Sequence, residues 1–579
     1  MKDKKIDIFG QQMFFRQLKP AAASAVTLAI GEVIDSIVVG SKLGMVGLAA
    51  MSIIMPIFMI FNVIMVGLGL GASISFSKLM ASGETDKARS SYKGTVIFTL
   101  LAGVFIAAIF NIFAPQFLYV LGVKNNMSGL YFVSIGAYRM LTAGAPIIML
   151  SFVVNYFMRN DDMEVFAGIG FSIGNISDFA LSLLFVLVLD MGALGAELAT
   201  VLGQFIALSI YGFFILTKSE NLKLKGIKPI YSGIISDLKV GFSSSVQYIL
   251  SFVFILIANN VLMNSQGIDG VGIFTIIQNI SYVFDTWYDA IVQSSQPVIT
   301  TFTGECNYKS REEVLSTEQF TGVISGGFIA LIICIFASTV CKIFGMTNAD
   351  TINLAKPAIY IYCISSLLSG YNQIIAGYEM CFREKISYIS SLLRKGIILV
   401  PSLLLFSIFA GKFIWLFYLF TEILSLIIID KFRKKIPDPS ITVPEDRIFR
   451  RLIRGKDDMP GCLEGIENFC EMFGVSMKQQ YFASMAVEEL CSAIIDKNFS
   501  GGRGIIQLTV IADNSGDFTM YIRDNAVEKN LMSVRYTLKD AKEDEETDFN
   551  ALGLNVIKQK AKDYSYRRYQ GFNTTMIKI

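Results

Sequence analysis

Long apolar segments follow one another along the first three quarters of the chain. An α-helix needs about 20 apolar residues to cross a bilayer, and about twelve stretches of that length can be placed before residue 431. They cover residues 19–41, 48–77, 95–117, 129–157, 165–189, 194–217, 243–263, 271–303, 317–344, 356–381, 386–410 and 413–430. Since 53% of the residues are hydrophobic and the mean hydropathy is positive, the sequence predicts an integral, all-α membrane protein.

The apolar region contains an internal repeat. The segments Gly83-Glu84, Ile112-Phe113-Ala114 and Leu121-Gly122 return later as Gly304-Glu305, Ile335-Phe336-Ala337 and Phe344-Gly345, and Arg159 returns as Arg383. Many secondary transporters are built from two such repeats, because two bundles that rock against each other expose one central site to either side in turn. The repeat predicts two six-helix bundles, residues 1–225 and 226–435, and makes transport the first functional hypothesis.

The distribution of basic residues predicts the orientation in the membrane. One set of loops is rich in Lys and Arg, including Lys87, Arg89 and Arg383, whereas the opposite set has isolated lysines at positions 42, 124, 342 and 412. Because basic loops stay in the cytoplasm, both termini are expected to be cytoplasmic. Residues 1–20 are too polar for a signal peptide.

Other features exclude several classes of protein. The chain has no histidine, which excludes Ser-His-Asp and Cys-His catalysis and HExxH zinc sites. Its eight cysteines are scattered without metal-ligand spacing, so reduced thiols are expected and no metal site is predicted. The basic loops are explained by membrane topology and imply no nucleic-acid partner. These features favour a transporter over an enzyme.

The first span carries two acids, Glu32 and Asp35, one helical turn apart. A carboxylate at the middle of a membrane costs about 3 kcal/mol even on mild scales, so an acid in a span is a candidate functional residue. The alternative is a structural role, in which Asp35 orients a helix and Glu32 faces a polar crevice without binding an ion.

The sequence around these acids resembles the multidrug and toxic compound extrusion (MATE) family. Asp35 is followed by Val39-Gly40, Leu43-Gly44 and an alanine-rich start of the next span, as in that family. Further similar segments are Tyr138-Arg139, Pro146, Met158 to Asp161, Gly174-Asn175-Ile176, Gly192 to Ala196, Ala199-Thr200, and Ser391 to Gly396 with Pro401. The resemblance covers roughly residues 10–435.

The resemblance implies a cation site in the first bundle. The family's site uses the first-span Asp together with an Asn and an Asp in the fifth span and a Thr in the sixth, and these positions fall on Asp35, Asp178, Ser182 and Thr200. The carboxylate has moved by one turn, but residues 178 and 182 share a helix face. Oxygen ligands suit Na⁺, whereas neighbouring acids, Glu32 included, suit H⁺, so the coupling ion stays open.

A second pair of acids lies in the eighth span. Asp285 and Asp289 are one turn apart beside Trp287 and Tyr288, an arrangement that attracts organic cations. They are candidates for a substrate path, with a water-exposed helix end as the alternative. The span that opens the second bundle is polar but uncharged, so we expect cation coupling mainly in the first bundle.

After residue 435 the composition changes to that of a soluble domain. Residues 436–445 form a proline-rich linker, and residues 446–579 are expected to fold as a cytoplasmic, two-layer α+β domain. Its predicted elements are helices at about 478–497 and 551–563, strands at 504–512 and 517–523, and two final strands.

The tail resembles the ATP-binding domain of anti-sigma-factor kinases and histidine kinases. Glu489, Asp524, Gly553 and Thr574 fall on that family's nucleotide-binding positions. However, Ala493 stands where the family has a Mg²⁺-binding Asn, and Ala526 replaces a glycine. We therefore expect a degenerate domain that docks a cytoplasmic protein partner or regulates the membrane region, rather than a kinase.

Together these features predict a Na⁺- or H⁺-coupled antiporter that exports organic cations or amphipathic drugs across the cytoplasmic membrane. Two alternatives remain. A lipid-linked-sugar flippase would need basic rather than acidic cavity residues, and a membrane-anchored signalling protein would act through its tail by phosphorylating or sequestering a regulator.

Overall fold

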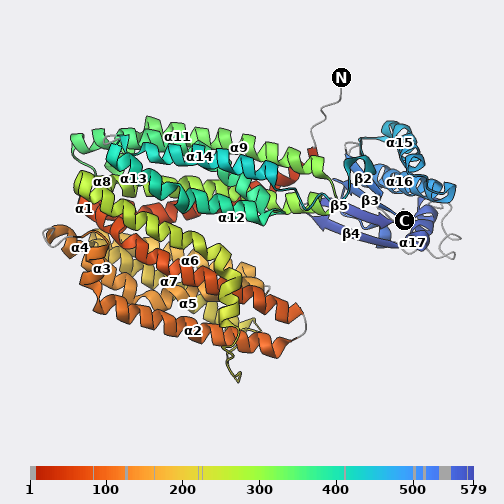
Figure 1. Ribbon diagram of the computed structural model, residues 1–579. Coiled ribbons are helices and arrows are strands. Elements are labelled where there is room, and N and C mark those ends of the chain that lie inside the picture. The colour runs from red at the N-terminus through yellow and green to blue at the C-terminus, as the bar shows by residue number, and fades with distance from the viewer. Residues whose placement is uncertain are drawn as a thin grey trace.

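The computed structural model describes residues 8–81, 84–123, 128–161, 163–219, 221–224, 226–409, 413–499, 504–512, 517–533, 549–569 and 571–579. A long helical region carries a small α/β domain, the tail, at one end (Figure 1). We call this the tail end of the helical region, and the opposite end the far end.

The helical region has two consecutive halves. The first comprises α1 (Ile8–Ala81), α2 (Thr85–Ile112), α3 (Ala114–Val120), α4 (Ser128–Ala143), α5 (Ala145–Asn160), α6 (Glu164–Ser182), the π-helix η1 (Leu183–Val188) and α7 (Gly192–Thr217). The second comprises α8 (Ile234–Gly304), α9 (Tyr308–Ile335), α10 (Ala337–Ile343), α11 (Ala349–Met380), α12 (Glu384–Leu392), the π-helix η2 (Leu393–Ile397), α13 (Leu399–Phe409) and α14 (Leu416–Lys435).

The longest helices, α1 and α8, are each broken at one glycine. Gly44 in α1 has φ +58° and Gly267 in α8 has φ +68°, a left-handed conformation that glycine adopts without steric cost. With 74 and 71 residues, each helix is long enough for two membrane crossings separated by the break. Within the described residues, eight helices are long and apolar enough to cross a membrane, and the bent pair α4–α5 makes a ninth.

Several backbone features recur in the two halves. The same sequence spacing separates Gly44 from Gly267 and the left-handed Gly122 from Gly345. Helices α2 and α9 both have 28 residues, and the short α3 and α10 that follow them both have 7. Each half also contains a π-helix, η1 after α6 and η2 after α12. The two halves therefore share these elements in the same order.

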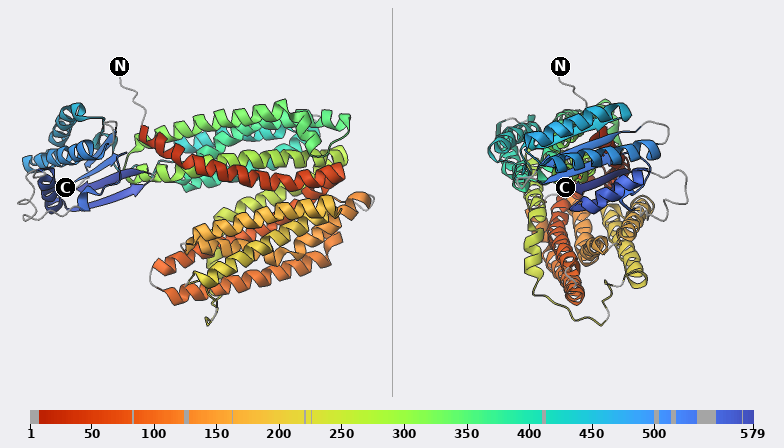
Figure 2. Two further views of the ribbon diagram at one scale, coloured as in Figure 1. Left: turned by 180° about the vertical axis from the view of Figure 1, so that it is seen from behind. Right: turned by 90° about the vertical axis from the view of Figure 1, so that its right-hand side faces the viewer.

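Helices α1 and α8 join the two bundles at the far end. Gly40 and Gly345 touch so closely that a Cβ on Gly345 would overlap the carbonyl oxygen of Gly40. Nearby, the Ser52 hydroxyl donates to Oδ1 of Asn259 at 2.8 Å, and the Thr275 hydroxyl donates to the carbonyl of Leu48 at 2.8 Å. Toward the tail end the bundles diverge (Figure 2).

The first half of α1 lies along the second bundle. Figure 2 shows this red helix running from the tail end beside the green helices. At Gly10 a Cβ would meet Val314 at 2.7 Å and Phe302 at 3.2 Å, which places the start of α1 against α9 and α8. In the same way the first half of α8 packs on the second half of α1, where Gly71 contacts the backbone of Asp237.

The tail is a five-stranded antiparallel sheet with helices on one face. Its elements are β1 (Ile448–Ile453), α15 (Met459–Met472), α16 (Met477–Asn498), β2 (Ile506–Ala512), β3 (Phe518–Asp524), α17 (Phe549–Lys560), β4 (Asp563–Tyr569) and β5 (Phe572–Lys578), with strand order β1-β2-β3-β5-β4. Alternate residues such as Leu508, Met520 and Ile577 form the core with the helices. The predicted helices and strands are present, but β1 and α15 were not predicted.

The other face of the sheet contacts the tail end of the second bundle. Gln507 donates to the hydroxyl of Ser310 in α9 at 3.3 Å, and the ring of Phe572 packs edge-on against Phe9 of α1 with a centroid distance of 5.5 Å. Arg311 of α9 forms a buried 2.7 Å ion pair with Asp438 in the linker. The linker and the tail are therefore packed on the helical region rather than tethered loosely to it.

Candidate functional site

The first bundle brings Asp35 and Ser182 together. The Ser182 hydroxyl donates to Oδ1 of Asp35 at 2.6 Å, joining α1 to the last residue of α6. Ser182 is fully buried, and the π-helix η1 begins at the next residue. Short π-helical segments inside α-helices are frequently found at functional sites.

Asp178 and Thr200 form a second pair next to the first along α6. The Thr200 hydroxyl of α7 lies 3.4 Å from Oδ1 of Asp178 and also 3.3 Å from the carbonyl of Ala196. Gly203 leaves the space that Asp178 occupies, since a Cβ there would lie 2.7 Å from the Asp178 Cβ. Asp178 lies one helical turn before Ser182, so both pairs share one face of α6.

Four of the predicted cation ligands therefore lie in adjacent pairs, on α1, α6 and α7. Glu32 lies one turn before Asp35 on α1, but its side chain is outside the described part of the structure. No group of three or more Cys, Asp or Glu side chains gathers as a metal site among the described residues. Two carboxylates with two hydroxyls suit the exchange of a monovalent cation or a proton.

The second bundle presents Asp285 and Asp289 differently. Gln373 of α11 donates to Oδ1 of Asp289 at 2.6 Å, and the Ser281 hydroxyl lies 3.3 Å from Oδ2 of Asp285. Asp289 is exposed, whereas Asp285 is half-buried.

The two aromatic residues predicted beside these acids point elsewhere. The Trp287 indole donates to the hydroxyl of Ser325 in α9 at 2.8 Å. Tyr288 is 1% exposed, and its ring fills the space left by Gly326 and Gly370. Both side chains thus pack inside the second bundle.

The structure adds charged residues that sequence reasoning did not assign to a site. Arg394 of η2 forms an ion pair with Glu422 of α14, with 2.9 Å between Nε and Oε2, and also donates to the hydroxyl of Ser369 at 2.6 Å. The neighbouring Lys395 donates to Oε1 of Gln247 at 3.1 Å. The signal was a pair of basic residues within an apolar span, which is unfavourable without an acidic partner.

Comparisons with known proteins show what the helical region resembles. The MatE family model matches residues 20–163. The helical region has the fold of the solved MATE transporters. The MATE fold extends well beyond the matched residues. A solved structure of a multidrug resistance MATE family transporter of the MOP superfamily, in its inward-facing conformation, aligns with a TM-score of 0.64 and 19% identity, covering 71% of this chain and 96% of that one.

Other MATE relatives are equally distant in sequence. The probable multidrug resistance protein YoeA of Bacillus subtilis is 23% identical over 62% of this chain and 78% of its own length. The multidrug export protein MepA of Staphylococcus saprophyticus is 24% identical over 45% of this chain and 58% of its own length. The ligand-bound structure of the MATE multidrug transporter DinF-BH aligns with a TM-score of 0.58 and 20% identity, covering 76% of this chain and all of that one. The predicted multi-pass helical fold is thereby confirmed.

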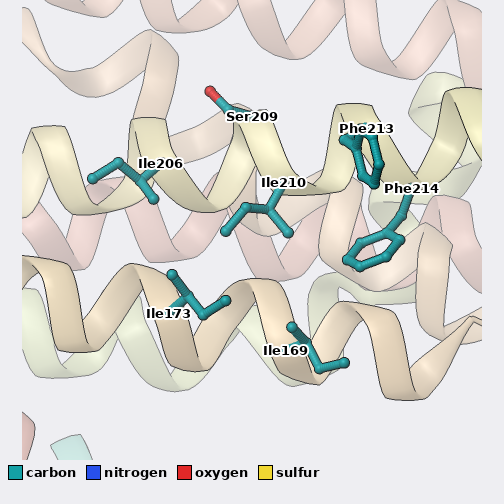
Figure 3. Close-up of a pocket in the computed structure, with 7 residues that line it drawn as sticks. All are labelled: Ile169, Ile173, Ile206, Ser209, Ile210, Phe213 and Phe214. Atoms are coloured by element: carbon teal, nitrogen blue, oxygen red, sulfur yellow. The ribbon is translucent and has the colours of Figure 1, made fainter.

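An apolar groove between α6 and α7 of the MATE fold lies apart from the candidate cation site (Figure 3). It is lined by Ile169, Ile173, Ile206, Ser209, Ile210, Phe213 and Phe214. Phe213 is 63% exposed and Ile173 is 42% exposed. In a membrane protein such an apolar outer groove is suited to contact with lipid chains.

The tail places its four nucleotide-type residues on two faces of the sheet. Oδ1 of Asp524 accepts from Nδ2 of Asn573 at 2.8 Å and from the backbone N–H of Ala526 at 2.9 Å, and burial raises the pKa of Asp524. Gly553 of α17 packs directly against the Glu489 carboxyl group, whose pKa is raised by burial and by neighbouring Glu488.

Thr574 lies on the opposite face of the sheet from Asp524. It pairs across the strands with Arg523, which faces the membrane region, whereas Asp524 pairs with Asn573. Ala493 is buried and offers no ligand for magnesium. The predicted lid, residues 539–548, and the turn 514–516 lie outside the described residues.

Proposed function

We propose that this protein is a cation-coupled exporter in which Asp35 is the central coupling residue. The observation that supports this most directly is the 2.6 Å hydrogen bond from Ser182 to Asp35, with Asp178 and Thr200 adjacent on the same helix faces. Binding of Na⁺ or H⁺ at Asp35 would replace this hydrogen bond, and so change how α1 packs on α6. Because α1 also contacts the second bundle, a change at Asp35 can affect both bundles.

Amphipathic organic cations are the proposed substrates. Relatives are named for multidrug resistance and multidrug export, and one solved MATE multidrug transporter has a ligand bound. Asp285 and Asp289 supply negative charge in the second bundle, which favours cations over the anionic head groups of lipid-linked sugars. The acids of the first bundle likewise favour cationic substrates.

We further propose that the tail end is cytoplasmic and that the tail regulates transport. The basic loop residues Arg89, Arg159 and Arg383 support this orientation through the positive-inside rule. The tail contacts α1, α8 and α9, so a partner that binds the tail could alter the movement of the second bundle. Because Ala493 cannot bind magnesium, regulation through a docked protein partner is a simpler role for the tail than a kinase reaction.

The coupling proposal can be tested in proteoliposomes. Ethidium efflux driven by an imposed Na⁺ or H⁺ gradient should be lost in Asp35→Asn and kept in Asp190→Asn. Asp190 is a suitable control because it is an exposed acid that pairs with Lys42 at 3.1 Å, away from Ser182. A gradient-driven rate that is unchanged in Asp35→Asn would contradict the proposal.

The regulatory role of the tail needs a second experiment. A stop codon after Pro444 removes the tail but keeps the Arg311–Asp438 ion pair that holds the linker. The exporter proposal expects gradient-driven efflux to persist with an altered rate. If this truncation abolishes function while Asp35→Asn has no effect, the signalling alternative is correct.

A further inference from the structure

A groove in the second bundle lies between α11 and α14, which run side by side (Figure 1). It has a volume of about 470 Å³. Helix α11 contributes Tyr371 and Ile375, and α14 contributes Leu426, Ile427 and, toward its end, one acid and three basic residues. Ile427 is 49% exposed, so the groove opens at the surface of the bundle. None of the residues predicted for the cation site or the substrate path lines it.

The chemistry of the groove changes along α14. Ile427, Lys431 and Lys434 follow one another at intervals of one helical turn, so they lie on one face of the helix. The apolar part comes first, and the charged part begins at Asp430, near the tail end where α14 stops at Lys435. From residue 426 to residue 434 the helix rises by about 12 Å. A phospholipid is divided in the same way, with a charged headgroup at one end and apolar chains at the other.

Arg433 lies at the charged end of the groove with only part of its guanidinium engaged. Its Nε donates to Oε1 of Glu379 on α11 at 2.7 Å. The same carboxylate, which is fully buried, also accepts from Arg383 at 2.5 Å and 2.7 Å. One acid thus serves two arginines, which leaves one positive charge in excess. Within the described part of the chain, no protein group accepts from the Nη atoms of Arg433, and its side chain is 25% exposed.

Two lysines contribute further charge to the groove. Lys434 forms an ion pair with Asp430, one turn earlier on α14, at 2.6 Å. Lys431 is exposed and forms no ion pair with any of the described residues. Together with the arginine cluster, the charged end therefore has an excess of two positive charges. An arginine with open N–H groups next to an unpaired lysine is a set of donors that suits the oxygens of a phosphate.

Basic residues at the end of a membrane helix also have a structural explanation. They interact favourably with the carbonyl groups of the last turn and keep the loop in the cytoplasm. Lys435 fits this explanation, because it is exposed and lies outside the groove. The explanation does not require an open groove that continues from the charges onto aliphatic side chains and the ring of Tyr371. Tyrosine is enriched at the level of lipid headgroups, where its ring and its hydroxyl meet different surroundings.

We propose that this groove binds an anionic phospholipid, with its phosphate at Arg433 and Lys431 and an acyl chain along Ile427. Basic pockets between membrane helices at the cytoplasmic side bind anionic headgroups. A zwitterionic lipid carries a positive charge of its own, which the excess of basic side chains repels. The bound phosphate would bridge α14 to the cluster on α11. That cluster reaches the linker, since Arg383 donates to the carbonyl of Ile436 at 3.0 Å.

Calorimetric titration of the purified full chain in a neutral detergent tests this proposal, with short-chain phosphatidylglycerol as the probe. Lys431→Gln combined with Lys434→Gln should weaken the Kd by about tenfold, because each basic residue near a headgroup contributes and Asp430 offsets part of the effect of Lys434. Lys431→Arg with Lys434→Arg should bind as the wild type does. Lys385→Gln with Lys435→Gln, which removes two exposed charges near the same helix ends but outside the groove, should leave the Kd unchanged.

The apolar end of the groove has its own matched pair of variants. Ile427→Asn should weaken the binding of phosphatidylglycerol, because the acyl chain would meet a polar side chain. Ile423→Asn is the control, since Ile423 is 43% exposed one turn earlier on the same helix and does not line the groove. A melting temperature equal to that of the wild type shows that each variant is folded.

Equal affinity for short-chain phosphatidylcholine would overturn the proposal, and so would an unchanged Kd in the Lys431→Gln/Lys434→Gln variant. Displacement of phosphatidylglycerol by a similar concentration of inorganic phosphate would also overturn it, because the groove would then bind a soluble anion rather than a lipid. None of these results bears on gradient-driven efflux in Asp35→Asn. The lipid site and the proposed export can therefore fail independently.

Discussion

Arg523 of β3 forms a buried ion pair with Glu305, the residue that directly follows α8. The side chains are 3% and 10% exposed, and the Arg523 guanidinium also lies 4.9 Å from the centre of the Phe302 ring. A charge pair buried at a domain interface is costly to break, because either partner left alone loses its hydration without compensation. This pair fixes the sheet of the tail to the second bundle.

Removal of one partner should release the tail. We expect Arg523→Met to weaken the packing of the tail on the second bundle by about 3–5 kcal/mol, since Glu305 would remain buried without its ion pair to Arg523. Limited proteolysis of the linker around Ser440 should then become much faster. Lys562→Met, which removes an exposed ion pair with Asp517, is the matched control and should leave the digestion rate unchanged. The double variant Arg523→Met/Glu305→Met should restore part of the protection, and its failure to do so would show that the ion pair itself is not what holds the interface.

The contact between Gly40 and Gly345 should be intolerant of any side chain. Gly345→Ala places a methyl group against the carbonyl oxygen of Gly40, at a residue with φ +84°. The left-handed backbone alone costs alanine about 1–2 kcal/mol, and the clash adds to this. We expect the melting temperature of the purified protein to fall and the far ends of the bundles to separate, as measured by distances between spin labels. Gly327→Ala, where no atom lies within 4 Å, should behave as the wild type.

Ser182→Ala should impair coupling without abolishing it. The substitution removes a hydroxyl that donates to Asp35, and a hydrogen bond to a charged group contributes about 1.5–3 kcal/mol. We expect gradient-driven efflux to fall by about tenfold. Thr200→Ala should have a smaller effect, because its contact with Asp178 is long, at 3.4 Å. Equal losses in the two variants would argue that the hydroxyls act only through helix packing.

Asp524 should make the tail less stable as the pH rises. Burial raises its pKa above the unfolded value of 3.8, so the protonated acid stabilises the folded tail fully below that value, and this contribution is lost as the pH rises through the folded pKa. Asp524→Asn removes the ionisation, so the protection of β3 and β5 amides in hydrogen exchange should depend less on pH as the pH rises above the unfolded pKa of 3.8. Asp563→Asn, an exposed acid in β4, is the control. If Asp524→Asn keeps the full pH dependence, another titratable group is responsible for it.

The sequence was most informative where one strong physical constraint acts. Apolar segments of spanning length and the repeated loop motifs predicted the helices and their duplication, because lipid leaves few alternatives to a helix. The pairing of Asp35 with Ser182 could be anticipated from the resemblance together with the period of a helix. In the tail, alternating residues predicted β2 and β3 correctly.

Other features depend on contacts between distant segments. The ion pair of Arg394 with Glu422 joins two spans, and nothing local in either span specifies its partner. Thr574 lies on the opposite face from Asp524 because strand pairing sets it beside Arg523. Trp287 and Tyr288 were assigned to the substrate path because they are neighbours of Asp285 and Asp289 in the sequence. Successive residues of a helix point about 100° apart, however, and these two side chains pack inside the second bundle.

The contact between Phe9 and Phe572 has a consequence for biosynthesis. Both rings are almost fully buried, one at the start of α1 and the other at the start of the final strand. A ribosome makes Phe9 long before Phe572, so the start of α1 must wait, partly uncovered, while the rest of the chain is translated and inserted. The contact between Phe9 and Phe572 can therefore form only after translation has reached β5. In a chain released before that point, it would not form.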